Sequence, residues 1–202
     1  MKCERLAIPE VVLIEPGIAR DGRGYFSESY VERELEGFGV RAHFVQENHS
    51  LSVARATVRG LHFQIHPHAQ DKLVRAVRGA VFDVAVDIRI GSPTFGKHVT
   101  AILSAENRLQ VWIPKGFAHG FCTLEAGSEV LYKVSDYYDR ALDRGLRWND
   151  PDLLIQWPIA SSEAALSPKD LGLPRFAQLA PHFRYEGAGA SAPCPRWAGL
   201  AS

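Results

Sequence analysis

The chain has 202 residues, of which 46% are hydrophobic, so it is long enough to form a single domain with a sizeable core. Its 23 basic and 23 acidic residues give a formal net charge of zero, which argues against binding nucleic acid or an anionic membrane through a long-range field. It has no secretory leader and no apolar run that could span a bilayer, so we expect a cytoplasmic protein that does not bind membranes.

The first predicted elements are strands within residues 6–14, where Pro9 marks an edge or a break. Residues 21–24, DGRG, have the glycine content of a tight turn. From Ser29 the sequence SYVE resembles a capping box, so we predict a short helix that runs to about Glu36.

From residue 40 onward the sequence predicts one strand after another. Residues 81–90 have the clearest period of two, with apolar side chains on one face and Asp83 and Asp87 on the other. Further strands are predicted over residues 99–103, 109–113, 119–124 and 129–137. Many short strands at this spacing predict an all-β fold, an antiparallel sandwich or barrel.

The end of the chain has a different composition. Residues 143–180 are irregular, and we expect them to fold over the barrel as loops and short helical turns. Residues 181–202 are rich in Ala, Gly, Ser and Pro, which favours a flexible tail. We therefore predict one domain over residues 1–180 and a C-terminal tail over residues 181–202.

Residues 59–72, RGLHFQIHPHAQDK, concentrate polar side chains within an otherwise apolar region. In an extended segment, apolar residues at every second position would share one face, while His62, Gln64 and His66 would share the other. The polar face must either line a pocket or face water. We expect the chemistry of the chain to centre here.

Two histidines near the end of this segment, His66 and His68, have the spacing of a metal-binding cupin motif. Such a motif would have a carboxylate at the position of Lys72, and an ammonium there would repel a divalent cation. We therefore expect no metal site, and we interpret His66 and His68 as surface residues that flank Pro67 near a strand end. A metal-binding or non-catalytic cupin stays open as an alternative.

Four other side chains could transfer protons without a metal, namely His62, Lys72, His119 and Tyr132. Tyr132 lies on a predicted strand between apolar in-register neighbours, so its ring should point into the barrel, with a hydroxyl that needs a partner. Core packing is the alternative interpretation of this tyrosine taken alone.

The sequence also resembles a known family over about residues 5–180, through motifs that occur in the same order. They include DGRGYFSE at residues 21–28, FVQENHS at 44–50, RGLHFQ at 59–64, QDKLV at 70–74, WIPKGFAHGF at 112–121, WNDP at 148–151 and SPKD at 167–170. These motifs look like the signature of the dTDP-4-dehydrorhamnose 3,5-epimerases. The resemblance implies a cupin-type jelly roll, a homodimer with exchanged N-terminal strands, and neither a metal nor another cofactor.

The resemblance implies a substrate and the roles of four residues. The substrate is a dTDP-linked 4-keto-6-deoxy sugar, whose carbons beside the ketone can lose a proton because the charge delocalises onto the keto oxygen. By resemblance, His62 is the base and Asp170 its carboxylate partner. Lys72 lies near the developing oxyanion, and Tyr132 is the acid that returns a proton from the opposite face.

The resemblance also implies which residues bind the diphosphate, the sugar or the nucleobase. These positions are Arg23, Phe26, Glu28, Gln46, Asn48, Arg59, His119, Tyr138, Asp143 and Lys169. Phe26 and Tyr138 match aromatics that sandwich the thymine, and Asp143 stands where most members have glutamate. Part of each site would come from the other subunit.

Inversion of C3 alone, or action on another nucleotide-linked ketosugar, stays open beside 3,5-epimerisation. The outcome depends on the room for ring flipping and on the orientation of aromatics such as Tyr138. Incorporation of solvent deuterium at C3 and C5 would separate these alternatives.

Overall fold

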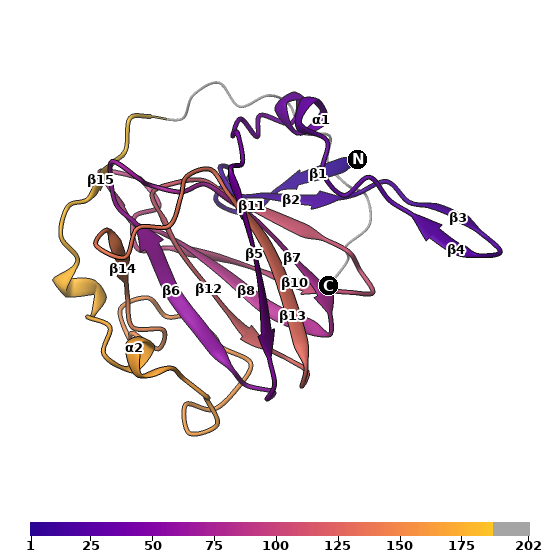
Figure 1. Cartoon of the computed structure of the whole chain (residues 1–202). Helices are drawn as coiled ribbons and strands as arrows, with labels where there is room; N and C mark the ends of the chain where they lie inside the picture. The colour runs from indigo at the N-terminus through magenta and orange to yellow at the C-terminus, as the bar shows by residue number, and fades with distance from the viewer. Residues whose placement is uncertain (188–202) are drawn as a thin grey trace.

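The structure is a computed structural model that describes residues 1–187, and two antiparallel sheets form its body (Figure 1). The six-stranded sheet has the order β1 (Lys2–Arg5), β2 (Val12–Glu15), β11 (Gln110–Ile113), β7 (Lys72–Arg78), β13 (Ser128–Val134) and β5 (Gln46–Ser52). The five-stranded sheet has the order β10 (His98–Ser104), β8 (Ala80–Asp87), β12 (Phe117–Thr123), β6 (Val58–Gln64) and β14 (Asp143–Gly145). The predicted antiparallel jelly roll is confirmed.

Apolar side chains fill one part of the space between the sheets. The buried residues that pack there include Val74, Val130, Val81, Ala85 and Phe121. Toward the edge strands β5 and β14, polar side chains take the place of this packing and line a cavity. The fold therefore leaves space for a ligand at one side of its core.

Each sheet also has an apolar outer face that other segments cover. On the five-stranded sheet, Leu61 packs in a buried cluster with Leu146 and Phe183 of the C-terminal region. On the six-stranded sheet, Trp112 packs in a buried cluster with Leu35 from the N-terminal region. Because the outer face of β6 packs in the apolar cluster that contains Leu61, the strand stays anchored to the core even though alternate residues on its inner face are polar.

The predicted strands over residues 99–103, 109–113, 119–124 and 129–137 correspond to β10, β11, β12 and β13. The strands predicted within residues 6–14 instead flank most of that range, because β1 ends at Arg5 and β2 begins at Val12. Pro9 lies in the turn between them, as its missing backbone donor favours.

The predicted helix after Ser29 is present but begins later than expected. Helix α1 spans Glu32–Gly37 with Val31 at its N-cap, and no side chain caps it. The backbone O of Ser29 accepts a hydrogen bond of 2.6 Å from the side chain of Gln110 on β11. The predicted capping box is therefore wrong, because a tertiary contact holds Ser29 outside the helix. No helix within residues 1–187 combines the length and the apolar character needed to cross a bilayer.

Residues 143–180 fold over the five-stranded sheet mostly as loops, with β14, α2 (Pro168–Leu171) and the 3₁₀ helix η1 (Phe176–Gln178) among them. Beyond residue 180, β15 (Phe183–Arg184) pairs in parallel with β9 (Arg89–Ile90), and Phe183 is buried. This segment differs from the predicted tail, because an aromatic side chain packs it onto the body. Residues 188–202 of the predicted tail lie outside the described residues.

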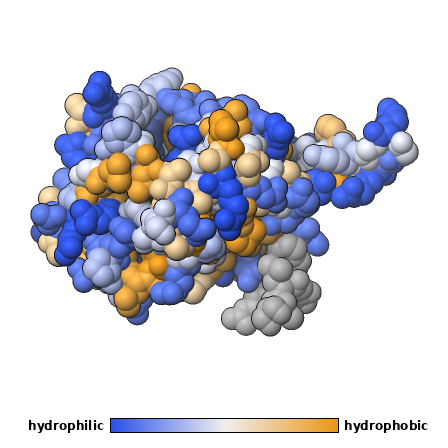
Figure 2. Space-filling view, turned by 90° about the horizontal axis from the view of Figure 1, so that it is seen from below, coloured by the Kyte–Doolittle hydropathy of each residue, from blue (hydrophilic) through white to orange (hydrophobic). Residues whose placement is uncertain are grey.

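A hairpin formed by β3 (Ala19–Asp21) and β4 (Gly24–Phe26) projects from the body (Figures 1 and 2). Every residue of both strands is exposed, and Phe26 is 69% exposed. Its position, away from the cavity-lining strands, decides which of the predicted site residues can meet within one chain.

Candidate active site

A cavity of about 690 Å³ lies between the two sheets, toward β5 and β14. This volume is within the usual range of small-molecule sites. Eleven of the predicted site residues line it, namely Gln46, Asn48, Arg59, His62, Lys72, His119, Tyr132, Tyr138, Asp143, Lys169 and Asp170. The structure therefore brings together side chains from six strands, one loop and a helix, although their roles stay predictions.

His62 enters the cavity from β6 in the five-stranded sheet. The alternation of the strand directs Leu61 and Phe63 to the outer apolar cluster, so His62 is directed inward. Nε2 of His62 lies 2.5 Å from Oδ1 of Asp170, whose side chain is buried. Strand β12 runs alongside, and its His119 is the register partner of His62.

Asp170 is held in place by the start of helix α2. Ser167, the N-cap, accepts a hydrogen bond of 3.1 Å from the backbone N of Asp170 and donates one of 2.7 Å to its Oδ2. Burial acts to raise the pKa of Asp170, but the hydrogen bonds from His62 and Ser167 outweigh it, so the pKa lies below its usual value. The ionised carboxylate accepts the proton on Nε2 of His62, which leaves Nδ1 as the basic atom.

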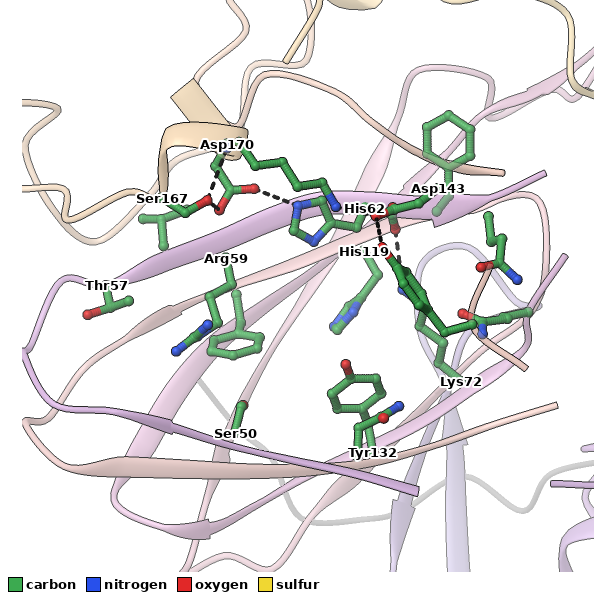
Figure 3. A pocket seen from close by; sticks show the side chains of 18 of the residues that line it. Ser50, Thr57, Arg59, His62, Lys72, His119, Tyr132, Asp143, Ser167 and Asp170 are labelled. Atoms are coloured by element: carbon green, nitrogen blue, oxygen red, sulfur yellow. Dashed lines mark hydrogen bonds and ion pairs between the residues drawn. The ribbon is translucent and has the colours of Figure 1, made fainter. Parts of the chain in front are cut away.

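Tyr132 enters the cavity from β13, in the opposite sheet. Its in-register neighbours Val130 and Val134 are buried, so the predicted orientation of the ring into the barrel is confirmed. Figure 3 shows the Tyr132 hydroxyl directed toward the wall that carries His62. Burial raises the pKa of Tyr132, so the phenol keeps its proton at neutral pH.

Two further basic side chains, Lys72 and His119, are buried in the cavity wall. Burial lowers the pKa of Lys72 from 10.5 to about 8, against the attraction of Asp143 and Asp83. Burial also lowers the pKa of His119, although its Nε2 lies 2.8 Å from Oδ2 of Asp83. At neutral pH the cavity therefore contains an ammonium beside a neutral imidazole.

Tyr138 lies at the mouth of the cavity and is 56% exposed. Its hydroxyl donates a hydrogen bond of 3.0 Å to Oδ2 of Asp143 on β14, and the ammonium of Lys169 contacts the same oxygen. Across the cavity, Nε of Arg59 donates to the hydroxyl of Ser52 at 3.1 Å. The rim therefore combines an aromatic ring with two cations, a combination that suits a nucleoside diphosphate.

Three predicted binding residues, Arg23, Phe26 and Glu28, do not line the cavity. Arg23 and Phe26 belong to the projecting hairpin, and the guanidinium of Arg23 pairs with Asp21 at 2.6 Å. Glu28 follows the hairpin and lines a smaller hollow near the N-terminus. A single chain therefore does not assemble the whole predicted set.

Sequence reasoning missed three residues that hold this site together, namely Gln64, Asp83 and Ser167. Gln64 lies on the polar face of β6 with His62, so the alternation of the strand was a usable signal. Ser167 had the signal of an N-cap before Pro168. Asp83 was predicted on a polar face, but its contact with a histidine on the neighbouring strand has no local sequence signal.

His66 and His68 do not line the cavity. His66 is exposed, as expected, and Nδ1 of the half-buried His68 lies 3.2 Å from a carboxylate oxygen of Asp136. Within residues 1–187, no three His, Cys, Asp or Glu side chains form a group that could hold a metal ion.

Comparison with known proteins identifies one family. The family model described as dTDP-4-dehydrorhamnose 3,5-epimerase matches residues 5–178. The enzyme of that name from Pseudomonas aeruginosa is 54% identical over 171 residues, covering 84% of this chain and 93% of the relative. The enzyme of that name from Sinorhizobium fredii is 50% identical over 185 residues, covering 92% of this chain and 94% of the relative. The crystal structure of the dTDP-6-deoxy-D-glucose-3,5-epimerase from Legionella pneumophila, in complex with dTDP-4-keto-L-rhamnose, is similar with a TM-score of 0.87 at 43% identity, covering 92% of this chain and 99% of that one.

Proposed function

The chain belongs to the dTDP-4-dehydrorhamnose 3,5-epimerase family and is an isomerase, and we propose that it converts dTDP-4-dehydro-6-deoxy-D-glucose to dTDP-4-dehydro-L-rhamnose by inverting C3 and C5. One observation supports this mechanism above the others. His62 and Tyr132 enter one cavity from opposite sheets, as removal and return of a proton on opposite faces of a sugar ring require.

His62 is the proposed base. The protons on C3 and C5 of the substrate are acidic because each carbon adjoins the C4 ketone. The ionised Asp170 carboxylate accepts the Nε2 proton and orients the ring, so Nδ1 of His62 takes the carbon-bound proton. The carboxylate also stabilises the imidazolium that forms.

Lys72 is the proposed stabiliser of the enolate. Removal of the proton places negative charge on the C4 oxygen, which a buried cation stabilises more strongly than water does. The ammonium of Lys72 already donates to the backbone O of His62 at 3.3 Å, so it lies beside the base. His119 is proposed to contact the substrate rather than to stabilise charge, and its bond to Asp83 presents its ring in a fixed orientation.

Tyr132 is the proposed acid. Its raised pKa keeps a proton on the phenol until a strongly basic carbanion forms opposite it. Return of that proton on the face away from His62 inverts the carbon. Chemistry by these side chains alone requires no metal and no other cofactor, and that independence is part of the proposal.

The nucleotide half of the substrate is proposed to bind at the rim, between two subunits. Arg59 and Lys169 supply local positive charge for the diphosphate, which the net neutral chain needs. Arg23 and Phe26 lie on a projecting hairpin outside their own cavity, which supports a homodimer with exchanged N-terminal strands in which they reach the partner's site.

The reaction in deuterium oxide tests the proposal. We expect dTDP-4-dehydro-6-deoxy-D-glucose to yield a product that carries solvent deuterium and inverted configuration at both C3 and C5, measured by proton NMR. Deuterium at C3 alone would instead identify a C3 epimerase. No deuterium at either carbon would contradict epimerase chemistry, and activity lost with a chelator and restored by a metal would contradict cofactor independence.

A further inference from the structure

The side-chain amide of Gln64 is buried beside the cavity and bonds only to backbone groups. Gln64 is 4% exposed and lies two positions after His62 on the inner face of β6. Its Nε2 donates to the backbone O of Tyr137 at 2.9 Å and also to the backbone O of His68. Its Oε1 accepts a hydrogen bond of 2.8 Å from the backbone N of Asp139. Both donors and the acceptor of the amide are therefore in use.

Two of these bonds enclose Tyr138. The O of Tyr137 belongs to the peptide group before Tyr138, and the N of Asp139 belongs to the peptide group after it. The relative orientation of two successive peptide planes is set by φ and ψ of the residue between them. One buried side chain therefore restrains both backbone torsions of Tyr138.

Other contacts restrain the backbone N and the hydroxyl of Tyr138. Its backbone N donates to Oε1 of Gln46, on the opposite edge strand, at 3.2 Å. Its hydroxyl donates to Asp143, which is the register partner of Gln64 on β14. A ring that is 56% exposed on a loop would otherwise sample several orientations. Here it is held at the backbone and at the tip.

We propose that Gln64 is a positioning residue that fixes the ring of Tyr138 at the cavity mouth and thereby sets the affinity for the nucleobase of the substrate. The inference rests on the proposed function, in which Tyr138 stacks on the base of a dTDP-linked sugar. Pre-ordering of the ring removes an entropic cost that binding would otherwise include. Gln64 bonds to no group placed in the proton-transfer machinery, so it acts on binding rather than on the chemical step.

The variant Gln64→Met keeps the length of the side chain and removes all three bonds. We expect the Kd for dTDP, measured by calorimetry, and the KM for the dTDP-ketosugar to rise about tenfold, while kcat changes less than about threefold. In a Tyr138→Ala background, Gln64→Met should have no further effect on either constant, because the ring that it positions is absent. Additive effects of the two substitutions would overturn the proposal.

Asn107 offers a matched control. Its side-chain amide also makes three bonds to backbone groups, with Ser104, Leu109 and Ile102 in the turn between β10 and β11, and none of these residues lines the cavity. Asn107→Leu should lower the melting temperature as Gln64→Met does and leave the Kd for dTDP unchanged. A purely structural role for Gln64 would give the two variants the same Kd.

If Gln64→Met does not fold, Gln64→Glu serves in its place, because it keeps the acceptor for Asp139 and loses both donated bonds. The same rise in Kd and the same absence of effect beside Tyr138→Ala are expected. Failure of the inference is distinct from failure of the proposed function. Absence of turnover in the wild-type chain would contradict the proposed function. Normal turnover in the wild-type chain, together with normal dTDP binding by the Gln64 variants, would contradict the inference about Gln64 alone.

Discussion

Nε2 of His62 and Oδ1 of Asp170 lie 2.5 Å apart, although 108 positions separate the two residues in the chain. The imidazole comes from a central position of β6 and the carboxylate from helix α2, which packs over the edge of that strand. The contact fixes both the tautomer and the direction of the ring. It therefore links the loop-rich C-terminal region directly to the proposed base.

Removal of the proposed base should abolish epimerisation. His62→Ala is expected to lower kcat at least about 10²-fold, the usual contribution of a general base. Asp170→Asn should lower kcat as well, since an amide can donate to Nε2 and favour the wrong tautomer. His49→Ala is the control, because His49 is an exposed histidine that pairs with Glu129 outside the cavity. An unchanged kcat in His62→Ala would favour a cupin without this chemistry.

Loss of the proposed acid should separate proton removal from proton return. In Tyr132→Phe, His62 still abstracts the carbon-bound proton, so solvent deuterium should enter the substrate with retained configuration. We expect the rate of inversion to fall at least about 10²-fold while the Kd for dTDP stays within about twofold. Tyr185→Phe, in which the ring lies against Arg89 away from the cavity, is the control. Equal loss of exchange and inversion would contradict the assignment of separate faces.

Much of the fold was predictable because it depends on local patterns. Period-two alternation predicted the strands from residue 81 to residue 134 and the inward direction of Tyr132, and it placed His62 on a polar face that would either line a pocket or face water. The start of helix α1 was not predictable in this way, because Ser29 is held by a side chain from β11. Burial of Phe183 was missed for a related reason, since a composition rich in small residues hides one aromatic contact.

The candidate site shows the same division. Residue types in matched motifs led to the eleven predicted residues that line the cavity. The groups that orient them, such as Ser167 beside Asp170 and Asp83 beside His119, depend on contacts between distant segments. Arg23 lies outside the cavity of its own chain, where sequence motifs alone could not place it.

The depressed pKa of Lys72 should appear in the pH dependence of the reaction. The pKa is lowered to about 8 by burial, so the ammonium that stabilises the enolate is lost as pH rises through that value. We expect kcat to fall on the alkaline side with an apparent pKa of about 8. The phenol of Tyr132, whose pKa is raised, does not titrate in this range. Lys72→Arg should lower kcat and remove the alkaline fall in the pH profile of kcat, because a guanidinium stays charged. An unchanged alkaline fall in this variant would exclude Lys72 as its source.

The same group should make the protein less stable at neutral pH. Because the pKa of Lys72 is lower in the folded state than the ordinary value of 10.5, the unfolded chain binds the proton more tightly. The contribution of this group to stability is therefore greatest above pH 10.5 and is lost as pH falls to about 8. Lys72→Met should raise the free energy of unfolding at pH 7 by on the order of 2–3 kcal/mol, measured by urea denaturation, while it lowers kcat.

Shared sites in a homodimer make a quantitative prediction for mixed subunits. Arg23 and Phe26 lie on the projecting hairpin, whereas His62 lies in the cavity, so a double Arg23→Ala, Phe26→Ala variant and a His62→Ala variant carry their defects on different parts of the chain. If the hairpin completes the partner's cavity, each variant alone is nearly inactive at low substrate concentration. In a mixed dimer, however, the intact hairpin of one subunit meets the intact cavity of the other and forms one normal site.

Unfolding and refolding an equal mixture of the two variants should therefore restore about a quarter of wild-type activity, because half of the dimers are mixed and each has one intact site of two. Activity is measured against each variant refolded alone. The matched control mixes Tyr132→Phe with His62→Ala. His62 and Tyr132 both line the cavity of their own chain, so every chain in this mixture has a defective cavity whichever partner it meets. Activity should therefore not return. Recovery in the control as well as the test, or in neither, would contradict a hairpin that crosses between subunits.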